Sequence, residues 1–344
     1  MTADIALYLG QNALTLGAIY TLLALALVLV FSVTRVIFVP QGEIMTFGAL
    51  SLVELHAGQV PKLVWVIFFL AFVAAGADAL AELRAGRSRL LRNLAGNLAW
   101  PAAALVLCLV LPLQQIGYPA QIALALFVSG AMGPLIYRLA FQPVAHASVL
   151  TLLLLAVALH VAMTSLGLFL FGPEGSGLPA FSDGSFTLGG LPVSNQTLWI
   201  WGSAAILAAA LFLFFRYSLF GKALRATSIS RNGAQLVGIS PSFAGKLAFT
   251  LATIIGAGSG ILIATTTVIA YDSGFVISLK GFVAAIVGGL VAYPVAALGA
   301  LLVGFIESFA SFWASPYKDA IVFALIIPVL IWRSVGTPHG EEEE

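Results

Sequence analysis

Three carboxylates within otherwise apolar stretches are the residues of this sequence best placed to do chemistry. Glu43 follows Gln41-Gly42 at the start of an apolar stretch, Asp78 ends the run Ala-Ala-Gly-Ala-Asp, and Glu307 lies in Gly-Phe-Ile-Glu-Ser-Phe. A charge at the centre of a bilayer costs about 2.5–3.5 kcal/mol, so each carboxylate should face protein or water rather than lipid. Such groups can contact a solute ammonium group, hold a gate or carry ion coupling.

The three positions favour different roles. Glu43 stands at the mouth of a short span and fits a translocation path or gate as well as it fits an interfacial anchor. Asp78 lies near Arg84 and the expected cytoplasmic edge, which favours anchoring. Glu307 favours a structural hydrogen bond inside the protein over solute contact.

No catalytic motif accompanies these carboxylates. The sequence has no P-loop, no His-Glu-x-x-His and no Gly-x-Ser-x-Gly. The four histidines are scattered, and the single Cys108 excludes an internal disulfide and a cysteine-based metal cluster. The sequence therefore predicts no enzymatic activity of its own, no cofactor and no metal.

The composition indicates that lipid surrounds most of the chain. The 344 residues are 61% hydrophobic and 8% charged, with mean hydropathy +1.07, whereas a soluble domain carries about 25% charged residues. Apolar runs of about 20 residues, enough to cross a bilayer core, recur almost from end to end. The period-2 alternation of a membrane barrel is absent. We predict an all-α polytopic bundle, and the net charge of +1 implies no nucleic-acid partner.

The candidate spans divide residues 1–340, which we treat as one transmembrane domain followed by an acidic tail at 341–344. Two of them, 43–57 and 277–292, are short enough to be partial or re-entrant helices, so the expected count is nine to eleven. The candidate spans are 13–34, 43–57, 62–81, 94–113, 119–141, 146–171, 197–217, 243–268, 277–292, 295–312 and 319–333.

Lysine and arginine set the orientation, because cytoplasmic loops carry an excess of both. With the N-terminus outside and the C-terminus in the cytoplasm, twelve of these residues fall inside and three outside, namely Lys62, Lys280 and Lys318. The 172–196 loop, rich in Gly, Pro and Ser, is then external. The 218–242 loop is cytoplasmic, and its pattern predicts short amphipathic helices with Gly238 as a stop. A basic loop of this size suits docking to a partner.

Short motifs in a consistent order cover nearly the whole chain. They are Gly17-Ala18-Ile19-Tyr20, Arg35-Val36, Gln41-Gly42-Glu43, Gly48-Ala49, Phe171-Gly172-Pro173, Arg225-Ala226, Asn232, Ala234, Leu236, Gly238-Ile239, Lys280-Gly281-Phe282-Val283-Ala284, Gly288-Gly289, Tyr317-Lys318-Asp319 and Trp332-Arg333. Each motif is weak alone. Together they resemble the branched-chain amino acid permease family of ATP-binding cassette importers.

The resemblance implies a permease subunit of the inner membrane that works by alternating access driven by a separate ATPase. The implied partners are a second permease subunit, as a homo- or heterodimer, two cytoplasmic ATP-binding subunits, and a periplasmic or extracellular solute-binding protein. It also implies two sets of functional residues: a translocation path or gate at Tyr20, Gln41, Gly42 and Glu43, and an ATPase-coupling element at Arg225, Ala226, Asn232, Leu236 and Gly238.

The chain departs from the family in two places. The family usually has His before Gly-Glu, where this chain has Gln41, which leaves the solute open between branched-chain amino acids, urea, amides and aromatic acids. The stretch 82–114 resembles an insertion of about one helix, whose basic cluster is interpreted as a positive-inside anchor.

A stand-alone secondary transporter or channel is the competing hypothesis. In it, Glu43 or Glu307 would carry ion coupling, and no ATPase would accompany the chain. An intramembrane enzyme is a third class, but the sequence lacks the polar residues it would need.

Overall fold

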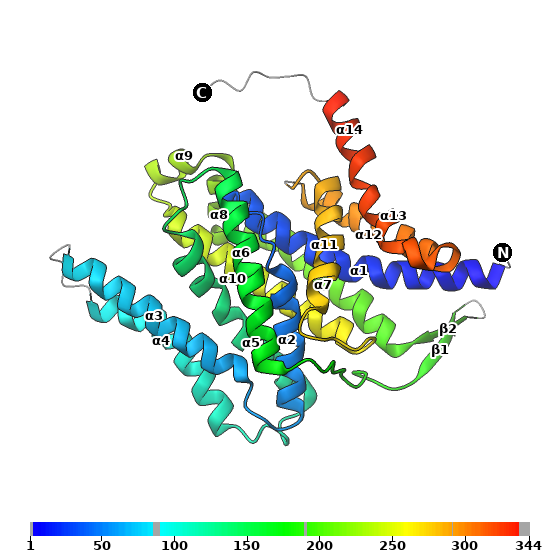
Figure 1. The fold of residues 1–344 in the computed structure, drawn as a ribbon, viewed down its shortest axis with the longest axis horizontal. Coiled ribbons are helices and arrows are strands. Elements are labelled where there is room, and N and C mark those ends of the chain that lie inside the picture. Colours follow the sequence, from blue (N-terminus) through cyan, green and yellow to red (C-terminus); the bar gives the residue numbers. More distant parts are fainter. Residues whose placement is uncertain (1–2, 85–89, 189–190, 291, 337–344) are drawn as a thin grey trace.

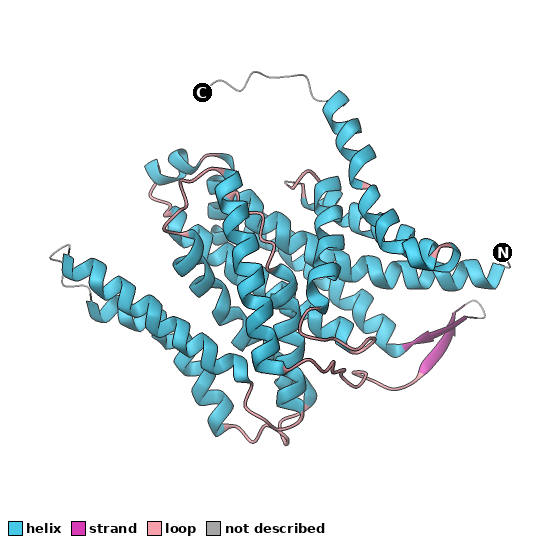
Figure 2. Ribbon diagram, in the orientation of Figure 1, coloured by secondary structure: helices cyan, strands magenta, loops and turns pink. Residues whose placement is uncertain are grey.

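The computed structural model describes residues 3–84, 90–188, 191–290 and 292–336, and helices make up most of this part (Figures 1 and 2). The helices are α1 (Ala3–Thr34), α2 (Gln41–His56), α3 (Lys62–Arg84), α4 (Leu90–Val110), α5 (Tyr118–Ile136), the π-helix η1 (Tyr137–Phe141), α6 (Val149–Phe171), α7 (Asn195–Tyr217), α8 (Leu219–Ile229), α9 (Arg231–Leu236), α10 (Pro241–Ala264), α11 (Ser273–Val287), α12 (Tyr293–Trp313), the 3-10 helix η2 (Ser315–Tyr317), α13 (Lys318–Ala324) and α14 (Ile326–Gly336).

Seven helices of the described part are long and apolar enough to cross a membrane: α1, α3, α5 continued by η1, α6, α7, α10 and α12. The prediction of an all-α polytopic chain is therefore confirmed. The two segments expected to be short are short: α2 has 16 residues and α11 has 15. The acidic tail at 341–344 and residues 85–89 of the expected insertion lie outside the described residues.

Helix α1 forms the centre of the bundle. Its residues from Ile19 to Val30 are almost wholly removed from the surface, and it packs most extensively against α12, then against α10 and α11. A helix that is apolar on every side must be buried in protein or surrounded by lipid, and α1 is enclosed by its neighbours over most of its length. In Figure 1 it runs across the middle of the molecule.

Helices α3 and α4 form a hairpin that leans away from the rest of the bundle in Figure 1. They pack mainly on each other and contact α5 more sparingly.

The 172–196 loop contains the antiparallel strands β1 (Ser185–Leu188) and β2 (Leu191–Ser194), with Phe186 opposite Val193. This hairpin was not expected from the Gly- and Pro-rich sequence of the loop.

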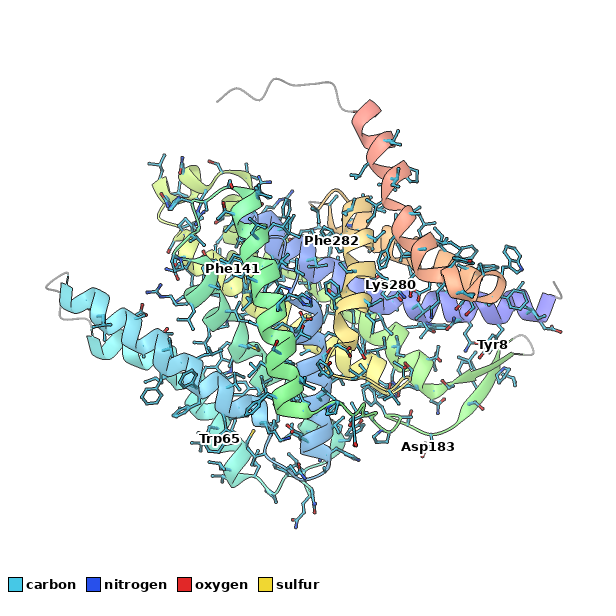
Figure 3. The ribbon with its side chains drawn as sticks, in the orientation of Figure 1. Tyr8, Trp65, Phe141, Asp183, Lys280 and Phe282 are labelled. Carbon is cyan, nitrogen blue, oxygen red and sulfur yellow. The ribbon has the colours of Figure 1, made fainter. Side chains whose placement is uncertain are left out.

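One basic residue lies elsewhere than its sequence suggested. Lys280 was assigned to the outer loops, but it lies in the middle of α11 and is only 5% exposed (Figure 3). Its side of the membrane stays a prediction, because two carboxylates, from α12 and α13, pair with this ammonium group inside the bundle. The charge of Lys280 is therefore explained by its ion pairs and does not indicate on which side of the membrane the residue lies.

Candidate functional site

Glu43 lies in the first turn of α2, where the chain re-enters a helix after a break. Helix α1 ends at Thr34, Arg35 adopts a left-handed conformation with φ of 62°, and α2 begins at Gln41. A carboxylate in the first turn of a helix is stabilised by the exposed N–H groups and the helix dipole. Glu43 is nevertheless 1% exposed, so its charge is held inside the protein.

Two side chains of α6 contact the Glu43 carboxylate. His160 Nδ1 lies 2.8 Å from Glu43 Oε1, and the Thr164 hydroxyl donates to the same oxygen at 3.4 Å. Because His160 and Thr164 are four residues apart, they share one face of α6. The second oxygen, Glu43 Oε2, is buried and has no hydrogen-bond partner among the described residues.

The N-terminus of α11 closes this site from another side. The ring of Phe275 stacks on the His160 imidazole, with 4.2 Å between ring centroids and 22° between planes. A Cβ on Gly42 would lie 2.4 Å from the Gly274 carbonyl oxygen, and one on Gly274 would lie 2.0 Å from the Gly42 oxygen. Only glycine at both positions lets the first turns of α2 and α11 approach this closely.

His160 is the site residue that sequence reasoning missed. It was taken as one of four scattered histidines, with no partner assigned. The available signal was the spacing of His160 and Thr164 at i and i+4 within the otherwise apolar run of α6. The structure brings an imidazole to Glu43 from another helix, although residue 41 itself is Gln.

The other two residues assigned to the translocation path point elsewhere. Gln41 is fully buried and donates through Nε2 to the Ala252 carbonyl oxygen of α10 at 3.0 Å, while its Oε1 has no partner among the described residues. The Tyr20 hydroxyl donates to Glu307 Oε2 at 2.5 Å. Tyr20 thus belongs to a second polar cluster and is not part of the Glu43 site.

The second cluster joins four helices through buried charges. Lys280 Nζ lies 2.5 Å from Glu307 Oε1 and 2.9 Å from Asp319 Oδ1. Glu307 is 5% exposed, so the expectation of an internal structural hydrogen bond is confirmed. The cluster ties α11 to α12, α13 and, through Tyr20, α1.

Asp78 forms a third set of polar contacts, with residues of η1 and α4. Its Oδ1 pairs with Arg138 Nη2 of η1, and its Oδ2 accepts from Asn97 Nδ2 of α4 at 2.7 Å. The contact with Arg138 tethers the α3–α4 hairpin to the bundle, and the interfacial anchoring expected for Asp78 stays a prediction.

The segment expected to couple to an ATPase forms two short helices, α8 and α9. Ser230 joins them and caps α9, because its Oγ accepts from the Gly233 N–H at 3.0 Å. Gly238 follows α9 with φ of +83°, as expected for a helix stop. Four of the five assigned residues, Arg225, Asn232, Leu236 and Gly238, are exposed, and Ala226 is partly exposed.

The exposed surface of this segment is apolar as well as basic. Ile229 is 80% exposed, Leu236 89% and Val237 73%. Large apolar side chains with this much exposure are often found at interaction surfaces. Arg231 Nη1 donates to the Ala145 carbonyl oxygen at 2.7 Å, which fixes α9 to the segment that precedes α6.

The described residues hold no group of three or more His, Cys, Asp or Glu side chains arranged to bind a metal ion. The contacts described above are charge pairs and hydrogen bonds. His160 of α6, Tyr20 of α1 and Glu307 of α12 lie in helices whose length and composition suit a membrane, and polar residues in such helices are typical of transport proteins.

Comparison with known proteins identifies the family. Residues 10–330 match the model of the branched-chain amino acid transport system permease component. The high-affinity branched-chain amino acid transport system permease protein BraD of Pseudomonas aeruginosa is 25% identical over 346 aligned positions, covering 98% of this chain and 97% of the relative. The corresponding protein LivH of Escherichia coli K12 is 30% identical over 227 positions, covering 64% and 74%. No solved structure gives a significant match. This chain belongs to the family of permease components of branched-chain amino acid transport systems.

Proposed function

We propose that this chain is the membrane-spanning subunit of an ATP-binding cassette importer that translocates branched-chain or closely related amino acids by alternating access. The family match supports the transport role, and the relatives' names supply the solute class. The proposed assembly contains a second permease subunit, two cytoplasmic ATP-binding subunits and an external solute-binding protein. ATP hydrolysis takes place in the ATP-binding subunits.

The proposed topology has nine to eleven membrane segments, with the N-terminus outside and the C-terminus in the cytoplasm. The seven long helices account for most of the segments. Helices α2 and α11 cross only part of the bilayer, because 16 and 15 residues span about 24 and 22 Å against a core of about 30 Å. The loop at 172–196 is then external, and the α8–α9 segment is cytoplasmic.

The observation that carries the proposed path is the unpartnered Glu43 Oε2 at the junction of the two short helices α2 and α11. Transporters often bind their substrates where broken helices begin near the middle of the membrane. A buried carboxylate oxygen without a hydrogen-bond donor destabilises the protein. We therefore expect a donor to reach Glu43 Oε2 during transport. The ammonium group of an amino acid is such a donor, and a gate that closes by hydrogen bonds is the alternative role.

Affinity purification followed by uptake in vesicles tests the proposal against the secondary-transporter hypothesis. An importer subunit should bring an ATPase with it, and leucine uptake should require ATP and the solute-binding protein. Uptake without either, driven by an ion gradient, would contradict the proposal. Unlabelled leucine, phenylalanine and urea as competitors identify the solute.

A further inference from the structure

One polar cluster of the bundle carries more positive than negative charge. It contains the ion pair of Asp78 with Arg138, and Lys246 beside it. Gly245 packs directly on the Tyr137 ring, because a Cβ there would lie 2.1 Å from Tyr137 Cζ. This contact packs α10 against η1, and the charges of Asp78 and Arg138 both act on Lys246, so that two cations lie near one carboxylate.

Lys246 has no partner of its own in the described part of the chain. Both Asp78 oxygens are occupied, Oδ1 by Arg138 and Oδ2 by Asn97. No acidic side chain of the described residues lies within ion-pairing distance of the Lys246 ammonium, and no hydrogen bond satisfies it. A partly buried cation without a counter-charge needs an anion or water from outside the protein.

The cluster lies at one depth in the proposed membrane orientation. Lys246 is five residues from the start of α10, about 7.5 Å along its axis, and Asp78 is six residues from the end of α3, about 9 Å. Arg138 lies in the π-helix that ends α5. The hydrocarbon core of a bilayer is about 30 Å thick, and the headgroup layers extend its thickness to about 40–45 Å. One to two helical turns from the helix ends corresponds to the edge of the hydrocarbon core, from which a lysine or arginine side chain can extend into the headgroup layer.

Apolar surface adjoins the free ammonium group. Phe243 precedes Lys246 by three residues, which puts both on the same side of α10. Phe243 is 48% exposed and packs against Phe220 of α8, which is 56% exposed, with 5.8 Å between ring centroids. A cation next to exposed aromatic rings suits an amphiphile better than a soluble anion, because the rings can cover its acyl chains.

We propose that the phosphate of an anionic membrane lipid binds this cluster, held by Lys246 Nζ and by the N–H groups of Arg138 that Asp78 leaves free. A guanidinium group has five donors in a planar fork and can bind a carboxylate and a phosphate together. Basic sites between transmembrane helices at the membrane surface bind lipid headgroups in this way. The bound lipid neutralises the excess charge and joins the α3–α4 hairpin to α10 through a second bridge.

The test measures lipid binding to the full chain, purified in detergent with its partner subunits and depleted of lipid. The probe is dioleoyl phosphatidylglycerol, followed by native mass spectrometry and by titration with a fluorescent analogue. The variant is Lys246→Gln. Its matched control is Lys222→Gln, which removes the same charge from an exposed position on α8. We expect Lys246→Gln to weaken the tightest phosphatidylglycerol site at least tenfold and Lys222→Gln to change it less than twofold.

Three outcomes would overturn the lipid site. They are equal lipid binding by Lys246→Gln and the parent protein, an equal loss in Lys222→Gln, and full displacement of the lipid by millimolar inorganic phosphate, which would show a soluble-anion site. Phosphatidylcholine should bind the parent protein and Lys246→Gln equally weakly. Because binding is measured without transport, its failure leaves the proposed importer function untouched.

Discussion

At the scale of single residues, Glu43 combines complete burial with incomplete hydrogen bonding. One oxygen meets His160 and Thr164, and the other meets no donor among the described residues. Sequence reasoning could select Glu43, because a carboxylate beside glycine at the start of an apolar stretch is unusual. It could not select His160, because the pairing depends on how α6 packs against α2.

The Glu43→Gln variant tests whether the charge at this site matters for transport. The substitution keeps the shape and removes the charge, so the hydrogen bond with His160 loses its carboxylate partner. We expect solute uptake to fall at least tenfold, while membrane insertion and association with the ATPase stay normal. Radiolabelled leucine uptake in vesicles, with protein level checked by immunoblot, measures this effect.

The matched control for Glu43→Gln is Glu54→Gln in the same helix. Glu54 lies at the other end of α2 and pairs with Lys62, whose side chain is 55% exposed. Loss of the Glu54 charge should therefore leave uptake within twofold of the parent protein. If Glu43→Gln is nearly silent and Glu43→Ala is damaging, the shape of the residue matters and its charge does not. Normal uptake by both Glu43 variants would reduce Glu43 to an interfacial anchor.

The Lys280→Met variant tests the buried charge cluster. Removal of one partner from a buried ion pair costs about 3–5 kcal/mol, because the other charge stays buried without compensation. We expect lower yield and a lower melting temperature in detergent, and partial recovery in the double variant Lys280→Met/Glu307→Gln. The neighbouring Lys318→Met variant is the control. A Lys280→Met protein as stable as its parent would show that the cluster contributes nothing to the fold.

At the scale of elements, the helical segments followed from sequence more readily than their ends and contacts. Runs of apolar residues located the long helices, and Gly238 after the last turn marked the end of α9. The β1–β2 hairpin was not predictable, since four-residue strands give no clear periodicity. The buried position of Lys280 was also missed, because its partners come from helices distant in sequence.

The Arg225→Glu variant tests the α8–α9 segment as the coupling element. Arg225 is exposed on α8 and forms no ion pair within the described part of the chain, so reversal of its charge should not disturb the fold. We expect uptake and solute-stimulated ATP hydrolysis to fall at least tenfold, with the permease inserted normally. Lys222→Glu, on the same helix, shows whether the effect belongs to one position or to net charge. Wild-type rates in Arg225→Glu would remove the residue from the coupling mechanism.

At the scale of the whole molecule, composition alone was sufficient to predict a polytopic α-helical membrane protein. Composition alone does not predict the number of membrane segments or their orientation. Short helices such as α2 and α11 do not meet a simple length criterion, and one of the lysines assigned outside is buried. The remaining charge bias still supports an external N-terminus.

Cysteine labelling in intact cells tests this orientation. A cysteine at Ser185, exposed on β1, should react with an impermeant maleimide, and one at Ser228, on α8, should react only after permeabilisation. The native Cys108 is buried and should give little background, and a Cys108→Ala parent removes it altogether. Equal labelling of both positions in intact cells would overturn the orientation.

The paired glycines at the start of α2 and α11 have a mechanical consequence. With backbone resting on backbone at Gly42 and Gly274, there is no flexible side chain between the two helices to absorb a displacement. A displacement of the C-terminal end of α11, near Val287, should therefore be transmitted about 21 Å along this helix to the turn of α2 that contains Glu43. The two short helices, α2 and α11, should therefore move together as one rigid unit.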